Sequence, residues 1–271
     1  MSESPRRARG RPRAFHDKTE ENKIKALDRS LSILTDLSKA DSLTLSELSE
    51  RTGEAPATVY RALITFADHE IVQLDKTTQL WRIGPGAFRI GSRFLRRNNL
   101  LEHSRPILRK LMQVTNETAN LGVENHDQVL FVSQEETHQT IRAFFPPGTL
   151  SPMHSSGIGK ALLAEYPPER VLAIIQSMGL THFTNNTITD PEGLNEDLAT
   201  IRRRGYSFDN EERTEGMRCV AAVVKGPYGG AVAGISISAP TFRLPENRVH
   251  EIGNLVVKAA ADLTRVLGGD V

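Results

Sequence analysis

The sequence predicts an α+β protein with two domains, and three observations lead to this prediction. Apolar residues recur at helical spacing over residues 26–70. Short strand-like runs bounded by polar turns appear in the second half of the chain. Residues 1–99 carry 18 lysines and arginines against 13 acidic residues, whereas residues 100–271 carry 16 against 20. The basic front is therefore the part expected to meet a polyanion.

The composition excludes several classes of protein. Cys219 is the only cysteine, which excludes an internal disulfide framework or a multi-cysteine zinc site and is typical of a reducing compartment. No run approaches the roughly 20 apolar residues that cross a bilayer, and no apolar region follows the first arginines as in a secretory signal. We expect a cytoplasmic, soluble protein without a membrane partner. No cluster has metal-ligand spacing, so neither a metal nor a cofactor is expected.

Residues 1–22 are predicted to be a disordered basic arm, because they lack apolar periodicity. Arg9 and Arg11 flank Gly10 in "RGRP". These four residues resemble the AT-hook core, which places arginines in a narrow A·T minor groove. A solvated tail is the alternative, and the DNA interpretation requires that a DNA-binding domain follows.

Residues 23–84 predict a winged helix-turn-helix domain. A first helix is expected over residues 26–39 from the spacing of Leu27, Leu31, Leu34 and Leu37. A short helix follows over residues 44–53, with Thr44 and Glu47 in capping-box register and Gly53 at its end. Residues 54–70 predict a longer helix and residues 71–84 a β-hairpin. An ordinary helical hairpin is the alternative, and the β-hairpin after the helices favours the winged helix.

In a helix-turn-helix domain the second helix enters the major groove by its N-terminal end. Residues at helical spacing form the stripe that we expect to be buried: Val59, Ala62, Leu63 and Phe66. The expected DNA contacts are Thr58 and Arg61 at base edges, with Ala57 as a further contact, Lys76 and Arg82 at phosphates, and Arg9 and Arg11 in the minor groove.

Residues 85–99 predict a linker helix, and residues 100–271 predict the second domain. Strand-like runs occupy residues 119–125, 128–134, 140–145, 219–224 and 231–238, and helical runs occupy residues 156–164, 168–178 and 191–204. A last helix carries Val249, Ile252, Val256, Ala260 and Leu263. Mixed helices and hairpin-connected strands indicate an antiparallel sheet that is covered by helices on one side.

The stretch "MHSSGIGKALLAE", residues 153–165, resembles a phosphate-binding loop only superficially. His154 stands where the first glycine is needed, and Ala161 stands where a serine or threonine must hold magnesium. The Ser-Gly-rich entry to a helix can still receive one small anion through its free N–H groups. A plain glycine-rich helix start, with no ligand, is the alternative.

The alternation of side chains along a strand predicts which residues lie on the same sheet face as Cys219. A two-residue turn at residues 228–229 pairs Cys219 with Ser238, and one at residues 227–228 pairs it with Ser236. Either even loop places the thiol and both hydroxyls on one face, in a pocket suited to a small polar ligand, whereas an odd loop would separate them. A nucleophilic cysteine would need a base such as His154. Because buried free cysteines are mostly inert, a catalytic role is the weaker alternative.

Six segments together resemble the IclR family of bacterial transcription regulators. The segments are "ALDRSLSIL", "LTLSELSERTGEAPATVYRAL", "WRIGPG", "MHSSGIGKALLAE", "RRRGYSFDNEE" and "EGMRCVAAVVKGPYGGAVAGISISAPTFRL". The resemblance covers residues 24–267. It implies a winged helix-turn-helix domain that binds operator DNA, a linker helix used in dimerisation, and a GAF-like domain that binds a small effector. It also implies homodimers that pair into homotetramers, and no enzymatic activity.

Within the family the chain looks most like the glyoxylate-responsive branch, whose best-known member represses allantoin utilisation. That resemblance implies that a 2-oxo acid, glyoxylate, binds through a shared set of residues: Gly157, Ile158, Asp209, Met217, Cys219, Ser236 and Ser238. Pyruvate as effector, or covalent bonding of an aldehyde to Cys219, are the alternatives. Two positions depart from the family pattern. Glu70 stands where many relatives have a glycine that closes the recognition helix, and Val223 replaces a frequent proline.

Overall fold

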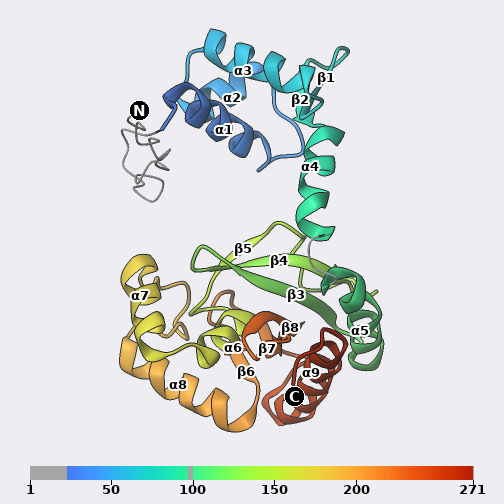
Figure 1. The fold of residues 1–271 in the computed structure, drawn as a ribbon, viewed down its shortest axis with the longest axis vertical. Coiled ribbons are helices and arrows are strands. Elements are labelled where there is room, and N and C mark those ends of the chain that lie inside the picture. The colour runs from blue at the N-terminus through green and yellow to red at the C-terminus, as the bar shows by residue number, and fades with distance from the viewer. Residues whose placement is uncertain (1–22, 97–99, 271) are drawn as a thin grey trace, which may run out of the picture. The chain divides into compact units, whose positions relative to one another are not determined.

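The computed structural model describes residues 23–96 and 100–270 (Figure 1). The predicted basic arm with Arg9 and Arg11, and residues 97–99 at the end of the predicted linker helix, lie outside the described residues. The chain separates into two compact units between Phe94 and Leu95.

Helices and one β-hairpin build the first unit. The elements are α1 (Lys25–Leu37), α2 (Leu45–Thr52), α3 (Pro56–Asp68), β1 (Val72–Asp75), β2 (Leu80–Ile83) and α4 (Pro85–Arg96). The predicted capping box is confirmed: the Thr44 side chain accepts the N–H of Glu47, and Glu47 accepts the N–H of Thr44 at 2.8 Å. Gly53 ends α2 with a φ of 67°, which a residue with a side chain rarely adopts. The short helix, glycine turn and longer helix of the prediction are therefore present.

Only part of the leucine row that predicts α1 is buried. Leu27 and Leu31 are 52% and 48% exposed, whereas Ile33 and Leu37 are fully buried. Ile33 and Leu37 belong to the core that also contains Leu63 and Trp81. Leu34 is partly buried against the same core, so the helix and half of its leucine row are confirmed. The packing of α2, α3 and the hairpin against α1 leaves the other two leucines outside the core.

The second unit is built on a sheet of the order β5-β4-β3-β8-β7-β6, and all its described strand pairs are antiparallel. Its strands are β3 (Thr118–Asn125), β4 (Gln128–Glu135), β5 (Leu150–Pro152), β6 (Ser207–Asn210), β7 (Met217–Lys225) and β8 (Ala231–Pro240). Its helices are α5 (Leu100–Thr115), α6 (Gly157–Glu165), α7 (Pro168–Met178), α8 (Pro191–Arg204) and α9 (Glu246–Val266).

Helices cover both faces of this sheet, so the prediction of helices on one side is wrong (Figure 1). On one face, Val220, Ile235 and Ile237 pack against α5 and α9. On the other face, Ala221 and Val129 pack against α6, and α7 and α8 complete that core. Alternate residues of β7 therefore serve two cores, which the alternation of side chains along a strand allows.

Residues 140–145 do not form the predicted strand. The edge of β4 is instead taken by the chain that follows: Phe131 donates its N–H to Thr149, and β5 pairs with residues 128–130. A second difference is β6, which pairs with β7 and was not predicted. The short strands β5 and β6 both pair with strands that are distant in the sequence, and their own residues show little strand periodicity.

The β7–β8 hairpin brings Cys219 opposite Ser238, as one of the two predicted registers requires. The route differs from the simple two-residue turn. Gly226 donates its N–H to Gly230, which leaves an odd loop of residues 227–229. A bulge then shifts the register, because Lys225 pairs with Ala231 while Val224 pairs with Ala233. The extra residue in β8 restores the even parity, so the thiol and the hydroxyls still share a face.

Candidate functional site

The start of α3 presents a short polar face in the first unit. Ala57 and Arg61 are exposed and Thr58 is half-buried, whereas Val59 and Leu63 are fully buried. The guanidinium Nε of Arg61 donates to the Ala57 carbonyl at 3.3 Å. A hollow of about 420 Å³ lies between α1 and this face, and it is lined by Thr58, Arg61 and Thr65 together with residues of α1. The geometry leaves the predicted base-contacting side chains accessible.

The two residues predicted to contact phosphates lie in different parts of the hairpin. Lys76 lies in the turn between β1 and β2, and Arg82 is an exposed residue of β2 opposite Gln73. The turn is shaped by Asp75, whose carboxylate accepts the N–H groups of Thr77 and Thr78. These two hydrogen bonds lower the pKa of Asp75. The Asp75 carboxylate is thus hydrogen-bonded to the backbone of the turn that carries Lys76.

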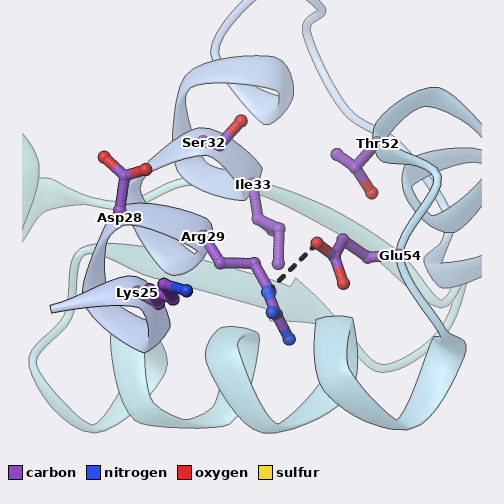
Figure 2. Close-up of a pocket in the computed structure, with 7 residues that line it drawn as sticks. All are labelled: Lys25, Asp28, Arg29, Ser32, Ile33, Thr52 and Glu54. Carbon is purple, nitrogen blue, oxygen red and sulfur yellow. Dashed lines mark ion pairs between the residues drawn. The ribbon is translucent and has the colours of Figure 1, made fainter. Parts of the chain in front are cut away.

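Figure 2 shows another hollow in the first unit, of about 350 Å³, between α1 and the turn that joins α2 to α3. An ion pair between Arg29 and Glu54, at 3.2 Å, crosses it. Lys25 and Asp28 add one charge of each sign to its lining. A hollow with balanced charges has no preference for an anion, so this hollow is not a second candidate for phosphate contact.

In the second unit, polar side chains gather on the sheet face that meets α6. Asn120 of β3 donates from Nδ2 to Ser236 Oγ at 3.3 Å and to Ser238 Oγ at 3.2 Å. Ser238 Oγ in turn donates to Cys219 Sγ at 3.4 Å. Gln134 donates to Asn120 Oδ1 at 2.9 Å. The predicted thiol and hydroxyls are thus one connected network, with Asn120 at its centre.

The N-terminal end of α6 packs closely onto this network. A Cβ added to Gly157 would lie 2.7 Å from Cys219 Sγ, so only a glycine fits there. The side chain of Ile158 fills the space left by Gly122 and Gly234, where an added Cβ would meet side chains at 2.7 Å. Ser156 caps the helix by accepting the N–H of Gly159. Three glycines therefore set how deeply the helix start sits on the sheet.

Asp209 lies opposite Cys219 on the neighbouring strand and is 8% exposed. Its Oδ1 accepts the N–H of Glu212 at 2.9 Å. Burial, and then the charge of Glu212, raise the pKa of Asp209 to about 7, although Lys160 and Arg213 oppose the shift. A carboxyl with that pKa is largely neutral below pH 7, when it can donate a hydrogen bond to an anion.

A buried ion cluster holds the β6–β7 turn against α6. Lys160 Nζ contacts Glu212 Oε1 at 2.6 Å, Asp197 Oδ2 at 2.7 Å and the carbonyl of Phe208 at 2.7 Å. Lys160 is only 1% exposed, so its charge is stable there because of the two carboxylates. These contacts raise its pKa against the opposing influence of burial. The lysine of the rejected phosphate-loop motif is thus a structural cation that links α6, α8 and the β6–β7 turn.

The thiol of Cys219 is not activated. Burial, and then the charge of Asp209, raise its pKa to about 12, and hydrogen bonds from Ser238, Ser236 and the Gly157 N–H only partly oppose this. The Nε2 atom of His154 lies 3.0 Å from the carbonyl oxygen of Thr181. Burial lowers the pKa of His154. His154 is thus not placed as a base for the thiol, and burial outweighs the hydrogen bonds that would favour a thiolate.

A cavity of about 20 Å³ opens beside this network, which is room for about one water molecule. It is lined by Phe145, Asp209, Arg213, Thr214, Met217, Arg218, Cys219 and Ser238. Four residues of the predicted effector set line it. Gly157 contacts Cys219 and Ser236 belongs to the same hydrogen-bond network, whereas Ile158 packs on Gly122 and Gly234. Asn120, Lys160, Glu212 and Arg213 were missed by the sequence analysis. A polar residue within the otherwise apolar run 119–123 was the only local sign of Asn120.

Among the described residues no group of three or more histidine, cysteine or acidic side chains is placed to hold a metal ion. No helix among them is both long and apolar enough to span a membrane.

Comparison with known proteins accounts for both units. Residues 26–76 match the model of the IclR helix-turn-helix domain, and residues 92–265 match that of the C-terminal domain of the bacterial transcriptional regulator IclR. The chain belongs to the IclR family. It is therefore a transcriptional regulator with a DNA-binding domain and an effector-binding domain, and not an enzyme.

Relatives of this IclR-family regulator match it along nearly its whole length. The HTH-type transcriptional regulator BhcR of Paracoccus denitrificans is 51% identical over 261 residues, which are 95% of this chain and 94% of that protein. The transcriptional repressor IclR of Escherichia coli is 37% identical, with 96% of each chain covered. The crystal structure of the Thermotoga maritima IclR has a TM-score of 0.76 at 27% identity, and the match covers 91% of this chain and 100% of that one.

Proposed function

We propose that this regulator binds operator DNA with an affinity that changes when a small 2-oxo acid, glyoxylate, enters the cavity beside Cys219. The observation that carries the proposal is the meeting of Asp209, Cys219 and Ser238 at one cavity, with the N-terminal end of α6 packed behind it. Hydroxyls, a neutral carboxyl and helix N–H groups together suit an acid that also carries an aldehyde or its hydrate.

In this proposal the N–H groups of Gly157 and Ile158 receive the carboxylate of the acid, and Met217 limits its size. Cys219, Ser236 and Ser238 meet the aldehyde or its hydrate. Asp209 donates to the ligand in its neutral form, which avoids placing two carboxylates side by side. The cavity of about 20 Å³ must widen to admit the acid. Glyoxylate requires the least widening, and pyruvate, which carries one methyl group more, is the second candidate.

A covalent link is a further alternative. The Cys219 S–H would add across the aldehyde C=O, forming an S–C bond while the proton moves to the oxygen. The raised pKa of the thiol argues against this route, because addition proceeds through the thiolate. Carbon-13 NMR of glyoxylate labelled at the aldehyde carbon tests for the S–C bond, because a thiohemiacetal carbon has a different chemical shift from the hydrate, and binding without the bond predicts no thiohemiacetal signal.

On DNA, we place the exposed start of α3 in the major groove, with Ala57, Thr58 and Arg61 at base edges. Lys76 and Arg82 of the hairpin contact phosphates. Arg9 and Arg11 of the arm add minor-groove contacts.

We also propose that the regulator forms homodimers that pair into homotetramers. Large apolar side chains on two helices support an interface between copies: Phe88 and Ile90 of α4 are 73% and 65% exposed, and Leu27 and Leu31 of α1 are about half exposed. Apolar surface of this kind is normally covered by a partner. Sedimentation of the full chain at micromolar concentration tests the oligomeric state.

Calorimetry of a double variant tests the cavity. Replacing Ser236 and Ser238 with alanine removes two hydroxyls of the network, so glyoxylate binding should be lost. Ser104→Ala, at a buried serine of α5 that donates to Leu101, is the matched control and should bind as the wild type does. Unchanged affinity in the double variant would exclude this cavity as the effector site.

A gel shift tests the regulatory function itself. The DNA is the region upstream of the protein's own gene, titrated with glyoxylate, pyruvate, glycolate and oxalate. We expect glyoxylate to change the apparent affinity about 5- to 150-fold, the usual range of allosteric coupling. If no acid changes the shift, the effector assignment fails, whereas DNA binding by the first unit is judged by the shift without acid.

A further inference from the structure

Arg213, in the turn between β6 and β7, lines the effector cavity together with Asp209, Cys219 and Ser238. Its guanidinium carbon lies 4.1 Å from the ring centroid of Phe183, so the group is stacked on an aromatic face. Stacking of this kind leaves the N–H donors at the edge of the guanidinium plane available.

The other cations near the cavity are already engaged. Lys160 is held by Glu212 and Asp197. Arg218, which also lines the cavity, donates to Asn210 Oδ1 at 2.8 Å and to the Leu244 carbonyl at 3.0 Å. Arg213 makes no ion pair or hydrogen bond with any residue in 23–96 or 100–270, although the charge of Asp209 acts on it. It is the cation of the cavity lining whose donors are free for a ligand.

The physical chemistry of this group favours an anion. Burial lowers the pKa of Arg213, which means that its positive charge is incompletely compensated where it lies. A carboxylate would compensate the charge and accept two parallel N–H groups from the guanidinium. Arg213 and Cys219 line the same cavity, so a carboxylate that enters it lies between Arg213 and the wall formed by Cys219, to which the N–H of Gly157 donates.

We propose that Arg213 is a further effector-binding residue, which pairs with the carboxylate of the acid and makes the site select acid anions over neutral aldehydes. Both carboxylate oxygens accept from the Arg213 guanidinium, and one of them also meets the N-terminal end of α6. The inference rests on the proposed function, because it assigns a partner to the same ligand in the same cavity. It adds the positively charged group that the predicted effector set lacks.

The experiment compares an anionic and a neutral probe on the full chain. Glyoxylate and glycolaldehyde are titrated by calorimetry into the wild type, Arg213→Gln and Arg213→Lys. Arg265→Gln is the matched control, because Arg265 is an exposed residue of α9 paired with Asp262. We expect Arg213→Gln to weaken glyoxylate binding about 10- to 100-fold, as the loss of a charge-assisted contact should. Glycolaldehyde should bind the wild type and this variant equally weakly.

Arg213→Lys should recover part of the affinity for glyoxylate, because a lysine keeps the charge but loses the bidentate geometry. Raising the salt concentration should weaken glyoxylate binding to the wild type more than to Arg213→Gln. Equal affinity of the wild type and Arg213→Gln for glyoxylate would overturn the assignment of Arg213 alone. So would an equal loss for both probes, which would mean that Arg213 only supports the cavity wall. If the wild type binds no acid at all, the proposed function itself fails.

Discussion

At the scale of the residue, the environment of Asp209 changes the pH range in which its carboxyl is charged. Burial and Glu212 raise its pKa to about 7, and Lys160 and Arg213 limit the rise. Glu212, Lys160, Arg213 and Cys219 are the titratable groups that act on it from α6, β7 and the β6–β7 turn. Because its pKa in the folded state is above the ordinary value of 3.8, the folded state holds a proton that the unfolded state releases. The stability that this proton provides is complete below about pH 4 and is lost as the pH rises through about 7.

Asp209→Asn tests this residue. Asparagine stays neutral and can still accept the N–H of Glu212, so the variant should lose less free energy of unfolding than the wild type between pH 5 and pH 8. Glyoxylate affinity should likewise fall over this range in the wild type and stay nearly constant in the variant. Urea unfolding and calorimetry at several pH values measure the two effects. Both proteins keep Glu212, so only a difference between their pH profiles can be assigned to Asp209. Parallel profiles would refute its role.

At the scale of the element, the end of α3 is under backbone strain. Glu70, just beyond the helix, has a φ of 59°, a left-handed conformation that costs a residue with a side chain about 1 kcal/mol. The departure from the family's glycine noted in the sequence therefore falls on a position that requires positive φ. Glu70 compensates only slightly, through an exposed ion pair with Arg89 of α4.

Glu70→Gly should therefore stabilise the first unit by about 0.5–1 kcal/mol and raise its Tm by roughly 3–6 °C. Trp81, the only tryptophan, is 3% exposed in the core of that unit, so its fluorescence reports the unfolding of this unit specifically. Glu70→Ala is the control: it loses the ion pair but keeps the strained backbone, and it should be no more stable than the wild type. A glycine variant with the Tm of the alanine variant would show that the strain is negligible.

At the scale of the whole molecule, basic residues are in excess in the first part of the chain and acidic residues in the second. The basic residues of 1–99 lie in the part that includes the DNA-binding domain, and the acidic excess of 100–271 lies in the effector-binding domain. Binding to operator DNA should therefore depend on salt mainly through residues of the first part.

Deleting residues 2–14 removes five arginines and should weaken operator binding. The slope of log K against log salt should fall by about one unit for each phosphate contact that is lost. Fluorescence anisotropy between 50 and 200 mM salt, a range over which such slopes are well resolved, is the measurement. A variant with the five arginines replaced by glutamine should behave as the deletion does. A deletion that keeps both affinity and slope would identify the arm as a solvated tail.

The sequence alone predicted the features whose information is local. The capping box at Thr44, the glycine turn at Gly53 and the helices of the second unit depend on neighbouring residues, so periodicity and turn chemistry were enough. Parity along two strands predicted that Cys219, Ser236 and Ser238 share a face, because alternation is a property of every strand, but the turn and its bulge decided that Cys219 pairs with Ser238. Family resemblance supplied the fold and the class of function, which comparison with known proteins confirms.

Only the tertiary structure decided the features that depend on distant partners. Residues 140–145 have strand-like composition but no free sheet edge, whereas β6 has weak local signals and an available edge at β7. Asn120 joins the network of Ser236 and Ser238 because β3 pairs with β8, and Arg213 reaches the cavity lining from the β6–β7 turn; no spacing in the chain encodes either meeting. The pKa of Asp209 likewise comes from burial and from charges brought near it by folding. Local pattern determines what an element is, and packing determines what each of its side chains meets.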